Sequence, residues 1–254
     1  MSLNNLRIVL VRPQYSGNIG SVARAMRNMG LNDLALVNPA PIQRAQAETM
    51  AVHAREVLEA MQVYPSLPAA VGPCGLVVGT TCRTGLYRDT VVSPRELAPH
   101  IVEAARVNRV ALVFGPEESG LSNDDLRVCH RLITIPSDSG YLSLNVSQAV
   151  LVCCYEVFLA THDAPAPTAV RPFATVAQQE LMYEKLKHAL LHIGFLHTQN
   201  PEHIMFALRR IFGRAALEER DVQILLGMAR QILWYATTGW QNEQPTQKTE
   251  NHES

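Results

Sequence analysis

Side chains suited to ligand chemistry are concentrated in loops that each follow a short apolar run typical of a buried β-strand. These loops are RPQYSGNIGSVARAMRNMG from residue 12, GTTCRT from residue 79, FGPEESGLSN from residue 114 and IPSDSGYLSLNVSQAV from residue 135. Ligands of α/β proteins bind beyond the carboxyl ends of the parallel strands. We therefore expect these loops to line one pocket.

The first loop combines glycines with arginines. Gly17 and Gly20 allow a backbone to approach a ligand closely at a helix start, where free N–H groups attract anions. Arg24 lies one turn further on, and the first 32 residues contain four arginines and no acidic residue. Taken alone, the loop is more typical of an ordinary helix start with solvated arginines, because short glycine motifs are common. It has neither GxGxxG nor Walker spacing, which disfavours dinucleotide or nucleoside triphosphate binding.

The other loops allow more than one interpretation. Adjacent Glu117 and Glu118 suggest a paired-carboxylate hydrolase, but neighbouring residues rarely face one cleft together. We expect these acids instead to hold arginines by charge-assisted hydrogen bonds. Thr80 and Thr81 suit either contacts to a nucleoside or a plain turn. Asn145 is a predicted N-cap of the helix that follows it.

The elements that must position these loops alternate along the first two-thirds of the chain. Apolar runs predict strands at residues 6–11, 34–38, 75–80, 109–115 and 132–136, without the alternation of half-exposed strands. Helical patterns occupy residues 19–29, 43–61, 93–107 and 145–162, with a further helix starting at residue 122. Strand–helix alternation predicts an α/β fold, a parallel sheet with helices on both faces.

The rest of the chain has a different character. Residues 163–172 contain three prolines and no periodicity, which is typical of a linker. Only helical patterns follow, at residues 176–193, 201–212 and 218–237, and residues 239–254 form a polar tail expected to be disordered. We therefore expect a domain over residues 1–162, a linker over 163–174, a small helical extension over 175–238 and the tail.

Composition limits the compartment and the partners. The chain has 254 residues, 47% of them hydrophobic, and a formal net charge of −1, so any nucleic-acid surface must be a local patch. Five cysteines without metal spacing favour free thiols, and no metal site is expected; His188 and His192 lack a third ligand pattern. The N-terminal apolar run is too short for a signal peptide and no run reaches membrane-spanning length, so we expect a cytoplasmic protein.

Taken together, the loops resemble the motifs of the SPOUT class of RNA methyltransferases, more closely its TrmH-type enzymes and most closely the TrmJ-type tRNA 2′-O-methyltransferases. Asn18, Gly20 and Arg24 match the first motif, LVFGPEESGLS the second, and IPSDSGYLSLN the third. The helical extension, including FALRRIFGRA, also resembles that of the TrmJ-type enzymes.

The resemblance implies a fold and a cofactor. The expected fold adds a C-terminal trefoil knot to the parallel sheet, a feature that sequence patterns do not reveal. The expected cofactor is S-adenosylmethionine, and the enzyme is expected to be a homodimer in which both subunits contribute to each active site. By position, the residues expected to contact the cofactor are Thr80, Thr81, Cys82, Gly115, Ile135, Leu142, Ser143 and Leu144.

The resemblance also implies catalytic and RNA-binding residues. The expected catalytic residues are Asn18, Arg24, Ser143 and Asn145. Arginine is a poor base because its pKa exceeds about 12, so Arg24 either is desolvated enough to take the ribose proton or stays charged and stabilises the developing alkoxide. We favour the second role. Arginines expected to contact RNA are Arg12, Arg24, Arg83, Arg88, Arg209 and Arg210. The alternative for the cluster of Arg209, Arg210 and Arg214 is a solvated helix face that pairs with Glu218 and Glu219.

The implied reaction is methylation of a tRNA ribose 2′-hydroxyl, at nucleotide 32 of the anticodon loop. Ribosomal RNA is an alternative substrate. A SAM-binding or RNA-binding module without transfer activity is a rival of another class, and the presence of Arg24, Ser143 and Asn145 argues against it. An α/β oxidoreductase is disfavoured because GxGxxG is absent.

Overall fold

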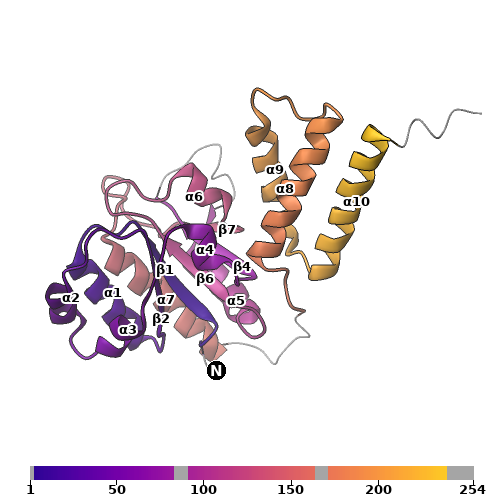
Figure 1. The fold of residues 1–254 in the computed structure, drawn as a ribbon. Coiled ribbons are helices and arrows are strands. Elements are labelled where there is room, and N and C mark those ends of the chain that lie inside the picture. The colour runs from indigo at the N-terminus through magenta and orange to yellow at the C-terminus, as the bar shows by residue number, and fades with distance from the viewer. Residues whose placement is uncertain (1–2, 83–90, 164–170, 239–254) are drawn as a thin grey trace, which may run out of the picture.

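The first part of the chain forms a parallel sheet. The computed structural model describes residues 3–82, 91–163 and 171–238. The sheet has seven strands in the order β3-β2-β1-β6-β4-β7-β5, and all its neighbours are parallel (Figure 1). The strands are β1 (Leu6–Val11), β2 (Asp33–Val37), β3 (Gln62–Tyr64), β4 (Leu76–Thr80), β5 (Val91–Val92), β6 (Val110–Phe114) and β7 (Arg131–Ile133).

Helices cover both faces of this sheet. Along β1, Leu6, Ile8 and Leu10 enter one core cluster, and Val9 and Val11 enter the other. The first face carries α1 (Ser16–Asn28), α2 (Arg44–Ala51), α3 (Arg55–Ala60), α5 (Pro94–Ala104) and α7 (Val146–Asp163). The second face carries α4 (Leu67–Val71) and α6 (Asn123–Arg127). The expected parallel sheet between helical layers is confirmed, and burial on both faces explains why the strands are continuously apolar.

The caps of the helices confirm the helix starts expected at residues 93 and 122. Gly30 follows α1 with a φ of +73°, the left-handed conformation of a C′ residue. Ser93 and Ser122 each cap a helix in a reciprocal capping box, with Glu96 and Asp125 as the partners three residues on. These caps fix where the chain leaves each loop.

Two predictions about elements were wrong. The helix expected over residues 43–61 is broken into α2 and α3, because Val52 adopts a φ of +54°. The short strands β3 and β5 and the helix α4 were not predicted. Strands of two or three residues are too short to show a periodic pattern in the sequence. β3 and β5 form at the two edges of the sheet by pairing with β2 and β7.

The helical extension consists of α8 (Val176–His192), α9 (Pro201–Ala215) and α10 (Glu219–Thr237), which stand together beside the sheet (Figure 1). It packs around its own core, which includes Met182, Met205 and Val222. Arg131 of β7 fixes α9, because its guanidinium donates to the carbonyl oxygens of Gly213 and Arg214 at 3.1 and 2.9 Å. The extension therefore packs directly against the sheet domain.

Other expectations concern the whole chain. All five cysteines carry free thiols, as expected. Within residues 3–82, 91–163 and 171–238, no helix combines the length and apolarity needed to cross a bilayer. In the same described segments, no group of three or more His, Cys, Asp or Glu side chains is placed to hold a metal ion. The trefoil knot stays a prediction; β7 lies between β4 and β5 although it follows both in the chain.

Candidate active site

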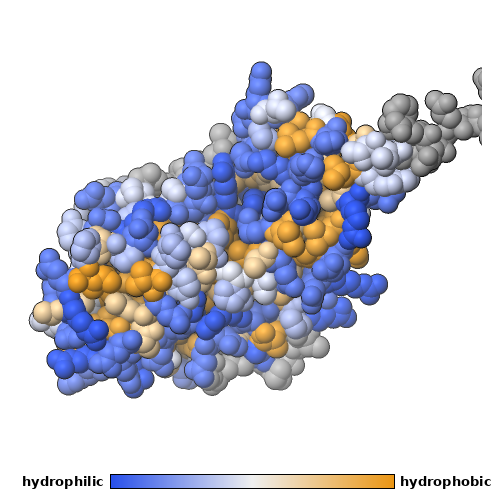
Figure 2. All heavy atoms as spheres, in the orientation of Figure 1, coloured by the Kyte–Doolittle hydropathy of each residue, from blue (hydrophilic) through white to orange (hydrophobic). Residues whose placement is uncertain are grey.

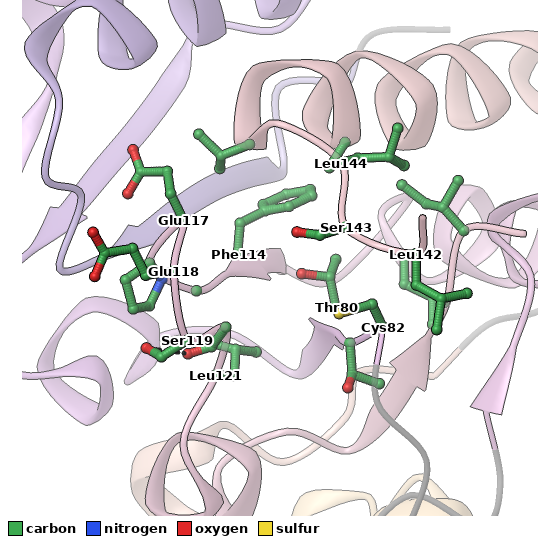
Figure 3. Close-up of a pocket in the computed structure, with 18 residues that line it drawn as sticks. Thr80, Cys82, Phe114, Glu117, Glu118, Ser119, Leu121, Leu142, Ser143 and Leu144 are labelled. Carbon is green, nitrogen blue, oxygen red and sulfur yellow. Dashed lines mark hydrogen bonds between the residues drawn. The ribbon is translucent and has the colours of Figure 1, made fainter. Parts of the chain in front are cut away.

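A pocket of about 260 Å³ lies at the carboxyl ends of β4, β6 and β7 (Figure 3). The loops after these strands form its walls, as the topology of parallel sheets predicts. All the residues expected to contact the cofactor line this one pocket: Thr80, Thr81, Cys82, Gly115, Ile135, Leu142, Ser143 and Leu144. Their contact with a cofactor stays a prediction, but the structure brings all of them together.

The walls of the pocket differ in chemistry. Ile133, Ile135 and Leu142 give one side an apolar surface. Glu117 and Glu118 lie on the opposite side from Leu142 (Figure 3). Such a pocket suits a ligand with a flat apolar part and a positively charged part. The side chains that line the pocket therefore fit S-adenosylmethionine, which carries an adenine and two cationic groups at neutral pH.

The loop after β6 is shaped by close backbone packing. A Cβ on Gly115 would lie 2.2 Å from the carbonyl carbon of Gly120, so only glycine fits there. Gly120 has a φ of +65°, and its N–H donates to the Pro116 carbonyl at 2.8 Å. This tight turn holds Glu117 at the rim of the pocket.

A chain of side-chain hydrogen bonds links the motif loops at this rim. The Asn18 amide donates to Oε1 of Glu117 at 2.7 Å, and the Asn145 amide donates to Oδ1 of Asn18 at 3.1 Å. The backbone N–H of Gln14 donates to the other oxygen of Glu117 at 3.3 Å. The expectation that Glu117 holds an arginine is therefore wrong: its carboxylate is occupied by amide donors of the first loop.

The structural role of Gly20 differs from the expected close approach of its backbone to a ligand. A Cβ at this position would lie 2.0 Å from the carbonyl oxygen of Ala47, in α2. Gly20 thus permits α1 and α2 to pack closely, and it is buried in that contact rather than exposed to a ligand. The sequence showed a glycine at a helix start but not the second helix lying on it.

Arg24 lies on the exposed side of α1 and is not among the residues that line the pocket. Ser143 and Asn145 are also exposed, and Ser143 lines the pocket. The structure therefore gathers Asn18, Ser143 and Asn145 at one rim and leaves Arg24 apart from it in the single chain.

The arginines expected to contact RNA differ in their interaction partners and in their burial. Arg12 forms a bidentate ion pair with the buried Asp125, which ties the first loop to the start of α6. Arg209 pairs with Glu180 through both carboxylate oxygens and stacks over the ring of Tyr183. The expected pairing of Arg209 with Glu218 or Glu219 is not what the structure shows. Arg210 lies half-buried on α9, and Arg83 and Arg88 lie outside the described residues.

Burial and hydrogen bonds act in opposite directions on Asp125. Burial by itself would raise the pKa of this carboxyl group, but hydrogen bonds from Arg12 and Ser122 outweigh it and lower the pKa. The carboxylate also closes the capping box of α6. Arg12 and Asp125 therefore stabilise the segment that leads into α1, the helix that carries Asn18.

Comparison with known proteins agrees with this geometry. Residues 5–155 match the SpoU rRNA Methylase family, and residues 177–247 match the C-terminal domain of the tRNA methyltransferase TrmJ. The tRNA (cytidine/uridine-2′-O-)-methyltransferase TrmJ of Cronobacter sakazakii is 41% identical, over 91% of this chain and 96% of that protein. The protein of the same name from Yersinia pestis (strain Pestoides F) is 39% identical, over 91% and 92% of the two chains.

Solved structures show the same arrangement. The crystal structure of TrmJ from Z. mobilis ZM4 matches with a TM-score of 0.76 and 31% identity, over 89% of this chain and 98% of that one. A probable methylase family protein from Haemophilus influenzae Rd KW20 matches with a TM-score of 0.61 and 35% identity, over 91% and 96%. This chain therefore belongs to the SpoU methylase family and, within it, to the TrmJ group.

Proposed function

We propose that this protein transfers a methyl group from S-adenosylmethionine to the 2′-hydroxyl of a tRNA ribose, at nucleotide 32 of the anticodon loop. The observation that carries the proposal is the pocket at the ends of β4, β6 and β7, with the hydrogen-bonded Asn145, Asn18 and Glu117 at its rim. Membership of the TrmJ group supports tRNA as the substrate. The family resemblance alone points to nucleotide 32.

The cofactor, when bound, supplies a methyl group that its positive sulfur has already activated. Ile135, Leu142 and Leu144 would hold its adenine among apolar side chains and backbone groups. The carboxylates of Glu117 and Glu118 would complement its positive charges. Much of the rate then comes from holding the ribose oxygen in line with the methyl group.

Arg24 is the cation that we assign to the RNA. Its guanidinium would bind a phosphate and stabilise the negative charge that develops on the ribose oxygen as the hydroxyl proton passes to solvent water and S-adenosylhomocysteine leaves. Because Arg24 does not line the pocket of its own chain, the assignment fits the homodimer expected from the resemblance, in which both subunits contribute to each active site.

We propose that the segments of the chain have the functions that the sequence indicates. Residues 1–162 carry out the transfer, residues 163–174 link, and the helices within 175–238 contact the tRNA. A reaction that consumes tRNA and S-adenosylmethionine belongs in the cytoplasm.

The direct test is to incubate the purified protein with unmodified tRNA and radiolabelled S-adenosylmethionine, and to map the label by nuclease digestion and mass spectrometry. We expect a 2′-O-methyl nucleotide at position 32. Label at another ribose would keep the reaction and reject the position. Label on ribosomal RNA only would replace the substrate, and cofactor binding without any product would favour the non-catalytic module.

A further inference from the structure

A second cavity, of about 560 Å³, opens between α1 and α2 next to the candidate cofactor pocket. The two cavities share Glu117, so a molecule that filled both would pass this carboxylate. The side chains that line the second cavity and are not part of the motifs are Tyr15, Ser21, Gln46, Thr49 and Met50. On the face seen in Figure 2, apolar atoms gather over the region of α1 and α2.

The walls of this cavity are held firmly. The contact of Gly20 with the Ala47 carbonyl places α2 against α1. The buried hydroxyl of Ser16 accepts a hydrogen bond from the N–H of Gln43 at 2.8 Å, which fixes the start of α2. Side chains on the next turn of α2 are therefore presented to the cavity from a fixed backbone.

The side chains in the cavity offer ring contacts and hydrogen bonds. Tyr15 is 55% exposed and Met50 is 46% exposed, so both present apolar surface to solvent. The amide of Gln46 is exposed and has no hydrogen-bond partner in the part of the chain that the structure describes. An aromatic ring, a flexible thioether and an unpaired amide are together what a splayed-out nucleobase requires.

We propose that the cavity between α1 and α2 receives the nucleobase of the target nucleotide, and that Gln46 contacts its Watson–Crick edge. This inference rests on the proposed function. Tyr15 and Met50 then contact the faces of the base, while the ribose lies at Glu117 between the two cavities.

The amide of Gln46 explains how one cavity would accept both pyrimidines. Cytosine presents an amino donor beside a ring acceptor, and uracil presents a carbonyl acceptor beside a ring donor. An amide carries one donor group and one acceptor, so rotation by 180° matches it to either base. A purine would place a larger ring system in the same space.

The test combines an enzyme variant with a changed base. Methyl transfer is measured on tRNA that carries cytidine at the target position and on tRNA that carries pyrimidin-2-one ribonucleoside, which lacks the amino group. We expect wild-type kcat/KM to fall about tenfold on the changed base, the effect of one lost hydrogen bond. Gln46→Ala should lower kcat/KM for cytidine about tenfold and should not discriminate between the two bases.

A matched control and a second variant make the outcome decisive. Gln223→Ala, at an exposed glutamine of α10, should retain the wild-type discrimination. Tyr15→Ala should raise KM for tRNA by roughly tenfold with little change in cofactor affinity. Continued discrimination by Gln46→Ala, or its absence in the wild type, would overturn the base-contact role. Failure of the wild type on cytidine itself would overturn the proposed function.

Discussion

The side-chain amide of Asn145 forms hydrogen bonds with two other residues, one through its nitrogen and one through its oxygen. Its nitrogen donates to the side-chain oxygen of Asn18, 127 positions earlier, at 3.1 Å. Its oxygen accepts from the backbone N–H of Ser147 at 2.9 Å, at the start of α7. The first hydrogen bond joins two residues at the rim of the candidate active site, and the second stabilises the start of α7.

The two roles of Asn145 can be separated by Asn145→Asp. An aspartate keeps the oxygen that caps α7 and is an equally good N-cap, so the free energy of unfolding should change by less than about 0.5 kcal/mol. It cannot donate to Asn18, so kcat should fall by roughly tenfold to 100-fold. Denaturant unfolding and single-turnover methyl transfer measure the two effects. Loss of stability with unchanged kcat would assign Asn145 to the helix alone.

Arg24→Ala is expected to reduce methyl transfer on the order of 100-fold or more, since it removes the charge assigned to the developing alkoxide. Cofactor affinity, measured by calorimetry, should stay within about twofold, because Arg24 does not line the pocket. Arg27→Ala is the matched control: Arg27 lies on the same helix, is exposed, and pairs with Glu56 at 2.7 Å. Persistent turnover by Arg24→Ala would remove this residue from the mechanism.

The close packing of α1 on α2 predicts a large effect for Gly20→Ala. The added Cβ would meet the backbone oxygen of Ala47, so α2 must move, and we expect a loss of about 3 kcal/mol in the free energy of unfolding. Gly17→Ala is the control, because its Cβ would make an ordinary contact of 3.6 Å with Met50. Alanine is also the better helix former, so this variant should be as stable as the wild type or slightly more stable. Equal denaturant midpoints for the two variants would contradict the packing role.

The region of α1 and α2, compared with the central sheet, shows which structural features the sequence predicts and which it does not. The apolar runs predicted the central strands because burial on both faces leaves a strong local signal. The break between α2 and α3 left none: Val52 is neither glycine nor proline, yet it adopts a positive φ. The loops that line the pocket could be predicted because they follow strands, and the individual pocket residues were implied by the family resemblance. Gln46 and Thr49 belong to no motif and reach their cavity only because α2 packs on α1.

The ion pair between Arg12 and Asp125 predicts a dependence of stability on pH. The pKa of Asp125 is lowered in the folded protein, so its contribution is complete above the unfolded value of about 3.9 and is lost as the pH falls through the folded value. Asp125→Asn should reduce the free energy of unfolding by about 1 kcal/mol at pH 7, since Arg12 is partly exposed. The difference from wild type should shrink below about pH 4. Asp124→Asn, at the exposed neighbour, should show almost no difference at either pH.

The arginines of α9 are expected to separate into one that stabilises the fold and one that contacts RNA. Arg209 is largely buried between Glu180 and the ring of Tyr183, so Arg209→Ala should lower the free energy of unfolding by about 2 kcal/mol. Arg214 is exposed near the end of the helix, and Arg214→Ala should leave stability unchanged. If α9 lies against the tRNA backbone, Arg214→Ala should also reduce the slope of log affinity against log salt by about 1. Filter binding across a salt series measures that slope, and a slope equal to wild type would place α9 away from the RNA.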